Sequence, residues 1–418
     1  MRGLRAFLCL GMIMCHMKAT SKELCPSLKD RLIFSEPPHS GLKSVPLVDL
    51  SSNMKRFFRK LWDLKVGKIR RVRIGFYGDS NHTMDWATSV LREHLGREFG
   101  YGGHGFIAAA QPWGWYQHRE ISVKASRGWK SYAVSIPKHP SKSYGHSGIL
   151  GIGFSGSSIS YKSEDRGSLE NRVFDEVEVH YSCQPTKGTL NVLIDKKVVG
   201  TINTFCKTKS YKIARFQTNL GKHQVELRVT QGAPFVYGLS FERNQAGLVV
   251  DGLGVGALNL AMMARLDRNI FHSGLTARNY DLVIIHTGTN MWAPRGHPRW
   301  AKTVIDRLRL SLGQDVSILL LSPPDFRDKK TKQPHIRMAQ CGKEKKQIAQ
   351  NEKVAFWDYY EVMGGFGSIL KWRKQGLTAP DYVHLKEGLH KIMMQNFAET
   401  LYQHGKSLWR KEFPRCKI

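Results

Sequence analysis

The stretch that decides the fold of this chain is Val72–Tyr77 (VRIGFY), which is followed at once by Gly78-Asp79-Ser80. A short apolar run that ends in glycine and small polar residues is typical of a buried strand followed by a tight turn. A helical pattern begins soon afterwards and extends over residues 83–95. The segment therefore predicts a strand of a parallel sheet with a helix connected to its carboxyl end.

The same alternation of apolar runs and helical patterns returns after residue 245. Four more strand-like runs follow, at Leu248–Val250, Leu282–His286, Val316–Leu321 and Val354–Trp357. Helical four-residue spacing joins Trp300, Val304, Leu308 and Leu312, and again Leu389, Met393, Phe397 and Leu401. Apolar strands alternating with helices are typical of a parallel sheet that is covered on both faces. The expected fold class is α/β, a flavodoxin-like three-layer α/β/α domain with a five-stranded parallel sheet.

The stretch between these two parts has a different pattern. Apolar and polar residues alternate around Val177–Tyr181, Leu190–Ile194 and Val225–Val229, and Gly-containing turns separate the runs. This period of two predicts an antiparallel β-sandwich. We expect it to be inserted as residues 118–245 between a first part of the α/β domain at 70–117 and a second part at 246–405.

The N-terminus has the features of a targeting signal. Arg2 and Arg5 precede the apolar segment Ala6–Cys15, which is too short to span a bilayer comfortably. We expect a signal peptide over residues 1–19 and an exported protein, located in the periplasm, in the cell envelope or outside the cell. Residues 20–69 form a predicted lead-in with a helix over 50–64, and residues 406–418 a basic tail.

The chain is strongly basic, with 64 Lys and Arg residues against 34 Asp and Glu residues and a formal charge of +30. A charge of this size raises the question of a nucleic-acid partner. The basic residues are scattered, however, and export argues against that partner. An anionic envelope or polysaccharide surface is the interpretation that fits export, with simple solubility as the alternative.

Seven cysteines occur among the 418 residues, and two of them fall within the predicted signal peptide. No Cys-x-x-Cys pair exists, so the spacing gives no support for a zinc or redox centre. In an exported protein, Cys183 and Cys206 are expected to form a disulfide, and a Cys25–Cys416 bridge is conceivable. At least one of the five remaining cysteines must then stay unpaired.

Four short motifs follow one another along the α/β part. They are Gly78-Asp79-Ser80 after the first strand, the glycine-rich segment 251–257 after the second, Gly288-Thr289-Asn290 after the third, and Asp381-Tyr382-Val383-His384 before the last helix. In this order they resemble the four blocks of the SGNH, or GDSL, hydrolase family. The resemblance covers residues 70–117 and 246–405 and implies a carboxylic ester hydrolase.

The resemblance also implies a role for each residue type. Ser80 would be the nucleophile, His384 the base that takes its proton, and Asp381 the carboxylate that holds the imidazole. An oxyanion would be met by the backbone N–H of Ser80, the N–H of Gly256 and the side-chain amide of Asn290. Relatives usually have one more residue in the glycine block than this chain, which leaves Gly254 as the alternative donor.

Two further groups of residues lie near the predicted site. The segment 99–116 is rich in glycine and aromatic residues, so it would either line an acyl or sugar subsite or pack at the domain junction. His82, His104 and His286 show no ligand spacing, and Asp85 is interpreted as structural. We therefore expect neither a metal ion nor a cofactor.

The inserted sandwich narrows the resemblance to bacterial peptidoglycan O-acetylesterases and related polysaccharide esterases, in which such an insertion is carbohydrate-binding-like. This implies an acetylated polysaccharide or peptidoglycan as substrate, with peripheral association to the envelope and a monomeric protein. We expect the insertion to emerge near Ser80 and to hold a polymer across the site. The alternatives are an O-acetyltransferase with the same triad, a lipase or thioesterase, and a non-catalytic carbohydrate-binding protein on a hydrolase scaffold.

Overall fold

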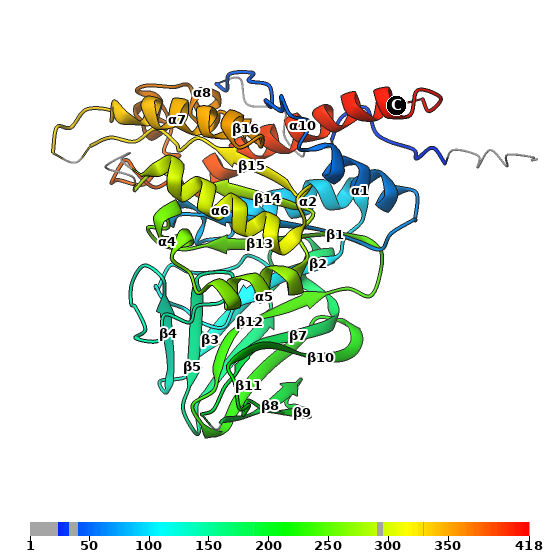
Figure 1. The fold of residues 1–418 in the computed structure, drawn as a ribbon, viewed down its shortest axis with the longest axis vertical. Helices are drawn as coiled ribbons and strands as arrows, with labels where there is room; N and C mark the ends of the chain where they lie inside the picture. The colour runs from blue at the N-terminus through cyan, green and yellow to red at the C-terminus, as the bar shows by residue number, and fades with distance from the viewer. Residues whose placement is uncertain (1–23, 33–40, 187, 291–295, 329, 418) are drawn as a thin grey trace, which may run out of the picture.

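The computed structural model describes residues 24–32, 41–186, 188–290, 296–328 and 330–417. The predicted signal peptide lies outside the described residues. Figure 1 shows a layer of helices around a parallel sheet and, next to it, a body of antiparallel strands. Within the described part of the chain, no helix is long and apolar enough to cross a membrane.

The parallel sheet has the five strands that the sequence predicts. They are β1 (Arg71–Gly78), β13 (Gly247–Gly254), β14 (Leu282–His286), β15 (Ser317–Leu321) and β16 (Ala355–Trp357). Their order in the sheet is β13-β1-β14-β15-β16, and every neighbouring pair is parallel. Numbered along the chain this is the order 2-1-3-4-5, which defines flavodoxin-like folds. The predicted fold class is confirmed.

The strands are apolar on both faces because helices cover both. Ile284 of β14 packs into one core, whereas its neighbours Val283 and Ile285 pack into another. The helices of the first core are α1 (Lys55–Lys65), α2 (Trp86–Phe99), α8 (Tyr359–Met363), α9 (Ser368–Lys374) and α10 (Glu387–Glu412). Those of the second are α4 (Leu260–Ala264), α5 (Arg268–Arg278), α6 (His297–Leu312) and α7 (Arg337–Asn351).

Helix boundaries differ from the prediction at two places that matter. The helix predicted from residue 83 begins at Trp86, because the short 3₁₀ helix η1 (Ser80–His82) occupies the turn after β1. At the other end of the chain, α10 continues through residues 406–412, which the sequence predicts as a tail. This last part is held by packing, since Trp409 of α10 is buried and its indole N–H donates to the Phe58 carbonyl.

The antiparallel strands form a β-sandwich, as predicted. One sheet has the order β10-β7-β12-β5-β4 with β2 paired to β12, and the other has the order β3-β6-β11-β8-β9. The first sheet consists of β2 (Gly103–Ala108), β4 (Trp129–Ala133), β5 (Ile149–Gly153), β7 (Phe174–Cys183), β10 (Ser210–Gly221) and β12 (Phe235–Glu242). The second consists of β3 (Ile121–Ala125), β6 (Ser158–Ser163), β8 (Gly188–Ile194), β9 (Lys197–Asn203) and β11 (Gln224–Gly232), and the short helix α3 (Leu169–Arg172) lies between β6 and β7.

The sandwich is joined to the parallel sheet by a shared core. Phe106 of β2 and Tyr237 of β12 belong to the same buried cluster as Leu253 of β13. Polar groups reinforce the junction, because the fully buried Arg278 of α5 pairs both with Asp251 at 2.8 Å and with Glu242 at 2.9 Å. Because the buried cluster and these ion pairs cross the junction, the sandwich and the parallel-sheet domain stabilise each other.

The sandwich begins earlier in the chain than the sequence predicts. Its strand β2 ends at Ala108, before residue 118, where the insertion is predicted to begin.

Two disulfides tie distant segments together. Cys183 at the end of β7 is bonded to Cys206, as predicted, and Cys25 is bonded to Cys416 beyond α10. Cys341 of α7 is a buried free thiol among the described residues. The Cys25–Cys416 bond fixes the start of the described chain to its end.

Candidate active site

The candidate site lies at the carboxyl ends of three adjacent strands. Ser80 follows β1, Gly256 follows β13, and Asn290 follows β14. In a 2-1-3-4-5 sheet the chain leaves the first strand on one side and returns on the other, so a crevice opens between β1 and β14. The topology therefore brings together side chains that are more than 200 positions apart in the sequence.

Ser80, His384 and Asp381 form a continuous hydrogen-bonded chain. Ser80 Oγ lies 2.9 Å from His384 Nε2, and His384 Nδ1 lies 2.6 Å from Asp381 Oδ2. This is the geometry of an activated nucleophile, with one imidazole nitrogen on the hydroxyl and the other on a carboxylate. The structure thus brings together all three residues that the motifs single out.

The Asp381 carboxylate is fixed by its own loop. Its Oδ1 accepts hydrogen bonds from the backbone N–H of Val383 at 2.9 Å and of His384 at 3.1 Å. Partial burial alone would raise the pKa of Asp381, but the hydrogen bonds from His384 and Val383 outweigh it and lower the pKa. The side chains of Asp381 and His384 remain 34% and 44% exposed, so a substrate can reach the pair.

Residues next to Ser80 hold its turn in place. Asp79 is buried and accepts from the N–H of Asn81 at 3.2 Å and from the N–H of Thr289 at 3.3 Å. Asn81 in turn accepts from the N–H of Leu385 at 2.9 Å. These contacts connect the Ser80 turn both to the loop of Asn290 and to the loop of His384, and the sequence motifs alone do not predict them.

The two glycines of the second block have different surroundings. Gly254 ends β13 opposite Gly78, and a Cβ there would lie 2.1 Å from the His82 carbonyl oxygen, so only glycine fits. Gly256 lies beyond the strand, against the ring of Trp113. Its N–H has no acceptor among the described residues. The side-chain amide nitrogen of Asn290 is likewise buried without a partner in the described structure.

Buried histidines lie beneath this turn. His82 Nε2 and His286 Nδ1 are 2.8 Å apart, and the ring of His390 packs against His82. Burial lowers the pKa of His82 and His286 well below its ordinary value and that of His390 to about 3. All three are therefore neutral at pH 7, and we assign them to packing beneath the site.

An apolar cavity of about 370 Å³ opens beside Ser80 and His384. Aromatic side chains form part of its wall, namely Trp86 of α2 and Trp115. Trp115 is 51% exposed, and its ring stacks against Trp113 with the centroids 6.4 Å apart. The aromatic segment predicted to line a subsite thus contributes to the cavity, whereas no described residue of 118–245 does.

Comparisons with known proteins agree with this fold. No protein-family model matches the sequence, and no curated protein is similar to it at the sequence level. Among solved structures, a peptidoglycan O-acetylesterase matches with a TM-score of 0.73 at 19% sequence identity, over 86% of this chain and 99% of that one. The match extends over both the parallel sheet and the sandwich.

Two further structures are much less similar. A salicylyl-acyltransferase from a tetracycline biosynthetic pathway has a TM-score of 0.31 at 13% identity, covering 72% of this chain and 97% of its own. A family two carbohydrate esterase from Clostridium thermocellum has a TM-score of 0.29 at 11% identity, covering 65% and 98%. Scores this low establish no shared fold. The TM-score of 0.73, by contrast, shows that the chain is similar in fold to a peptidoglycan O-acetylesterase, as the motif resemblance predicts.

Proposed function

We propose that this chain is a secreted serine esterase of the SGNH type that removes O-acetyl groups from a cell-envelope or extracellular polysaccharide such as peptidoglycan. The observation that carries the proposal is the hydrogen-bonded chain from Ser80 through His384 to Asp381 at the edge of the parallel sheet. A serine with a purely structural role would not require a partly exposed imidazole and carboxylate hydrogen-bonded in sequence to its hydroxyl. The geometry therefore favours nucleophilic catalysis over a purely structural role.

In the proposed reaction Ser80 Oγ attacks the acetyl carbonyl carbon, and its proton passes to His384 Nε2. The tetrahedral intermediate collapses, the bond from the carbonyl carbon to the sugar oxygen breaks, and His384 returns the proton to that oxygen. Water then attacks the acetyl-serine in the same way and releases acetate. Asp381 keeps the Nδ1 proton of His384 in place and stabilises the imidazolium that forms in each step.

Three donors are proposed to stabilise the negative oxygen of the intermediate. They are the N–H groups of Ser80 and Gly256 and the side-chain amide of Asn290. The Gly256 N–H and the Asn290 amide have no protein acceptor among the described residues, which supports this role, since a buried donor without a partner is costly. Donors already aimed at the site need no reorganisation when charge develops.

The substrate class rests on the surroundings of Ser80. Trp86 and Trp115 offer aromatic faces beside the nucleophile, which suit the apolar faces of sugar rings. The formal charge of +30 favours approach to an anionic envelope. Two disulfides are typical of proteins that fold in an oxidising compartment, in agreement with export.

The test compares wild type with Ser80→Ala on a chromogenic acetyl ester and on acetylated peptidoglycan and xylan, with acetate release as the readout. Ser311→Ala is the matched control, because Ser311 Oγ also contacts a histidine, His272 Nδ1 at 3.0 Å, far from the site. We expect Ser80→Ala to lose about 10⁴-fold or more of kcat, and Ser311→Ala to keep full activity.

Each outcome separates one part of the proposal from another. Activity retained by folded Ser80→Ala would exclude Ser80 as the nucleophile. Hydrolysis of the small ester without acetate release from either polymer would support the esterase activity but exclude acetylated peptidoglycan and xylan as substrates. Transfer of acetyl to an added oligosaccharide in preference to water would instead identify an O-acetyltransferase.

A further inference from the structure

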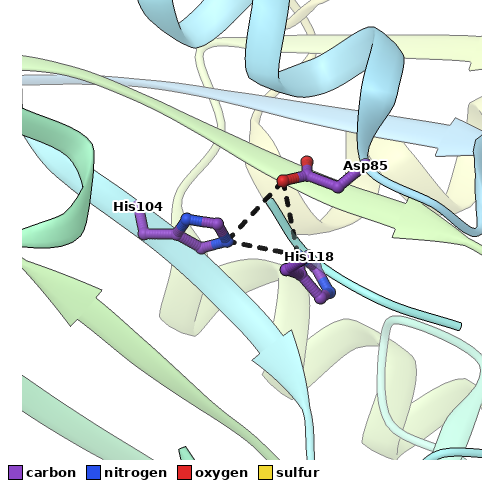
Figure 2. Close-up of side chains that lie close together, drawn as sticks. All are labelled: Asp85, His104 and His118. Atoms are coloured by element: carbon purple, nitrogen blue, oxygen red, sulfur yellow. Dashed lines mark hydrogen bonds and ion pairs between the residues drawn. The ribbon is translucent and has the colours of Figure 1, made fainter. Parts of the chain in front are cut away.

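Three buried side chains from separate segments each turn one atom toward a common point, as Figure 2 shows. Asp85 follows Ser80 by five residues, His104 lies on β2, and His118 precedes β3. None of the three side chains is more than 3% exposed. The sequence shows no ligand spacing here because each residue comes from a separate segment.

The separations between the three atoms have the size of a metal-ligand set. His104 Nε2 lies 3.1 Å from His118 Nδ1, and Asp85 Oδ2 lies 3.9 Å from the first and 3.8 Å from the second. A point equidistant from three atoms at these separations is about 2.1 Å from each, which matches bonds from Zn²⁺ to nitrogen and carboxylate oxygen. No side chain has to move to bring the three atoms within bonding distance.

The outer nitrogens of both imidazoles lie next to oxygen atoms. His118 Nε2 is hydrogen-bonded to the Tyr116 hydroxyl at 3.1 Å, and His104 Nδ1 lies 3.2 Å from the Glu120 carboxylate, outside hydrogen-bonding geometry. Metal-bound histidines commonly donate their other N–H to a carboxylate or a similar acceptor. With protons on these outer nitrogens, the two inner nitrogens present lone pairs to each other, and a cation between them would satisfy both; with one inner nitrogen protonated, the pair forms an N–H···N hydrogen bond instead.

The local charges also favour a cation. Arg92 pairs with Asp85 at 2.9 Å and with Glu120 at 2.9 Å, so one guanidinium faces two buried carboxylates. With neutral imidazoles the group carries one excess negative charge. Arg92 approaches Asp85 mainly at Oδ1, and its contact with Oδ2 is longer, at 3.3 Å. The backbone N–H of Arg119 also donates to Oδ2, likewise at 3.3 Å, and a cation at the common point would replace these two long contacts.

We propose that Asp85, His104 and His118 bind Zn²⁺, with Tyr116 orienting His118 and the Glu120 carboxylate beside the outer nitrogen of His104. Two imidazoles and one carboxylate form a donor set that suits this ion. The ion would link the start of α2, which follows the Ser80 loop, to β2 and to the segment just before β3. The site is independent of the proposed esterase function and replaces the sequence-based expectation that no metal is needed.

The test uses the full chain, freed of metal by a chelator and then titrated with Zn²⁺. We expect one tightly bound ion per chain by elemental analysis and a rise in Tm on binding. Co²⁺ in place of Zn²⁺ should give a visible absorption band that the metal-free chain lacks. His118→Gln should weaken binding more than about 100-fold and Glu120→Gln about 10- to 100-fold. His146→Gln, at a fully buried histidine that contacts Tyr280, is the control and should bind as wild type.

The competing state is a proton shared between the two imidazoles, with no metal at all. Absence of a stoichiometric Zn²⁺ ion and of the Co²⁺ absorption in the wild-type chain would establish that state and overturn the proposal without any variant. Wild-type affinity in His118→Gln would overturn it as well, because the ion would then be bound elsewhere. All of these readouts are independent of enzymatic activity.

Discussion

The molecule holds two histidine–carboxylate groups that differ in exposure and in origin. The His384–Asp381 pair is 44% and 34% exposed, comes from one short loop and contacts Ser80. The other group is a buried cluster assembled from the start of α2, β2 and the segment before β3. The buried cluster consists of Asp85, Arg92, His104, His118 and Glu120.

The difference in burial determines whether a histidine–carboxylate group serves mainly catalysis or mainly stability. The exposed pair can exchange protons with a substrate, and water screens its charges, so the stability of the fold depends on it little. In the buried cluster, every charge needs a partner, because an unpaired charge at such a depth costs several kcal/mol. Changes to the first group should therefore alter catalysis, and changes to the second should alter stability.

The largest effect is expected from Asp381→Asn. The amide cannot hold the imidazole of His384 in the required tautomer, so kcat on an acetyl ester should fall by about 10⁴-fold. The free energy of unfolding should change by less than about 1 kcal/mol, since the pair is half-exposed. Kinetics and urea denaturation on the same preparation check both values. A modest kcat loss together with marked destabilisation would remove the distinction between the two groups.

Arg92→Met should have the next largest effect, this time on stability. Two buried carboxylates would lose their cation, and the free energy of unfolding should fall by about 3–5 kcal/mol in urea denaturation. Lys302→Met is the matched control, because Lys302 pairs with Asp306 on the exposed face of α6 and should cost less than about 0.5 kcal/mol. Equal costs at the two positions would mean that burial of the cluster has no energetic consequence.

Asn290→Ala tests the contribution of the active-site amide. Loss of one oxyanion donor should lower kcat by about 10²–10³-fold while KM and the urea midpoint change little. Asn191→Ala is the control and should leave kcat unchanged, because Asn191 lies on the surface of the sandwich, where its side-chain oxygen accepts a hydrogen bond from the Thr201 hydroxyl. A kcat of the Asn290 variant within a few-fold of wild type would exclude the amide as a donor.

The smallest expected effect concerns pH, at a buried histidine outside both groups. Burial lowers the pKa of His390 to about 3, so the folded chain leaves it neutral at pH 5 whereas the unfolded chain protonates it. Protonation thus favours the unfolded state, and the free energy of unfolding should fall by about 2 kcal/mol from pH 7 to pH 5 on this account.

His390→Phe should remove this contribution. Neither ring nitrogen of His390 has a hydrogen-bond partner among the described residues, so the substitution leaves no acceptor or donor unpaired. Urea midpoints at pH 7 and pH 5 for wild type and variant give the difference. The same pH dependence in both proteins would show that His390 is not the group responsible.

The parallel sheet could be predicted from the sequence because its signals are local. A strand covered on both faces is largely apolar, and β14 and β15 each contain four consecutive apolar residues, at 282–285 and 318–321. The active-site motif is also local, since Asp381 and His384 lie three residues apart and Ser80 directly follows a strand. Helix ends were less predictable, because packing of Trp409 extends α10 beyond the point at which its pattern fades.

Local patterns in the chain predict the fold class and the order of the strands along it, and the resemblance of four short motifs to a known family singles out Ser80, Asp381 and His384. The three-dimensional fold alone sets which distant groups share a buried space. It placed β2 in the sandwich, set Arg278 between Asp251 and Glu242, and brought His104 and His118 to Asp85. The reason is physical, since burial makes a charge depend on whichever partner the fold provides, and no local pattern records that partner.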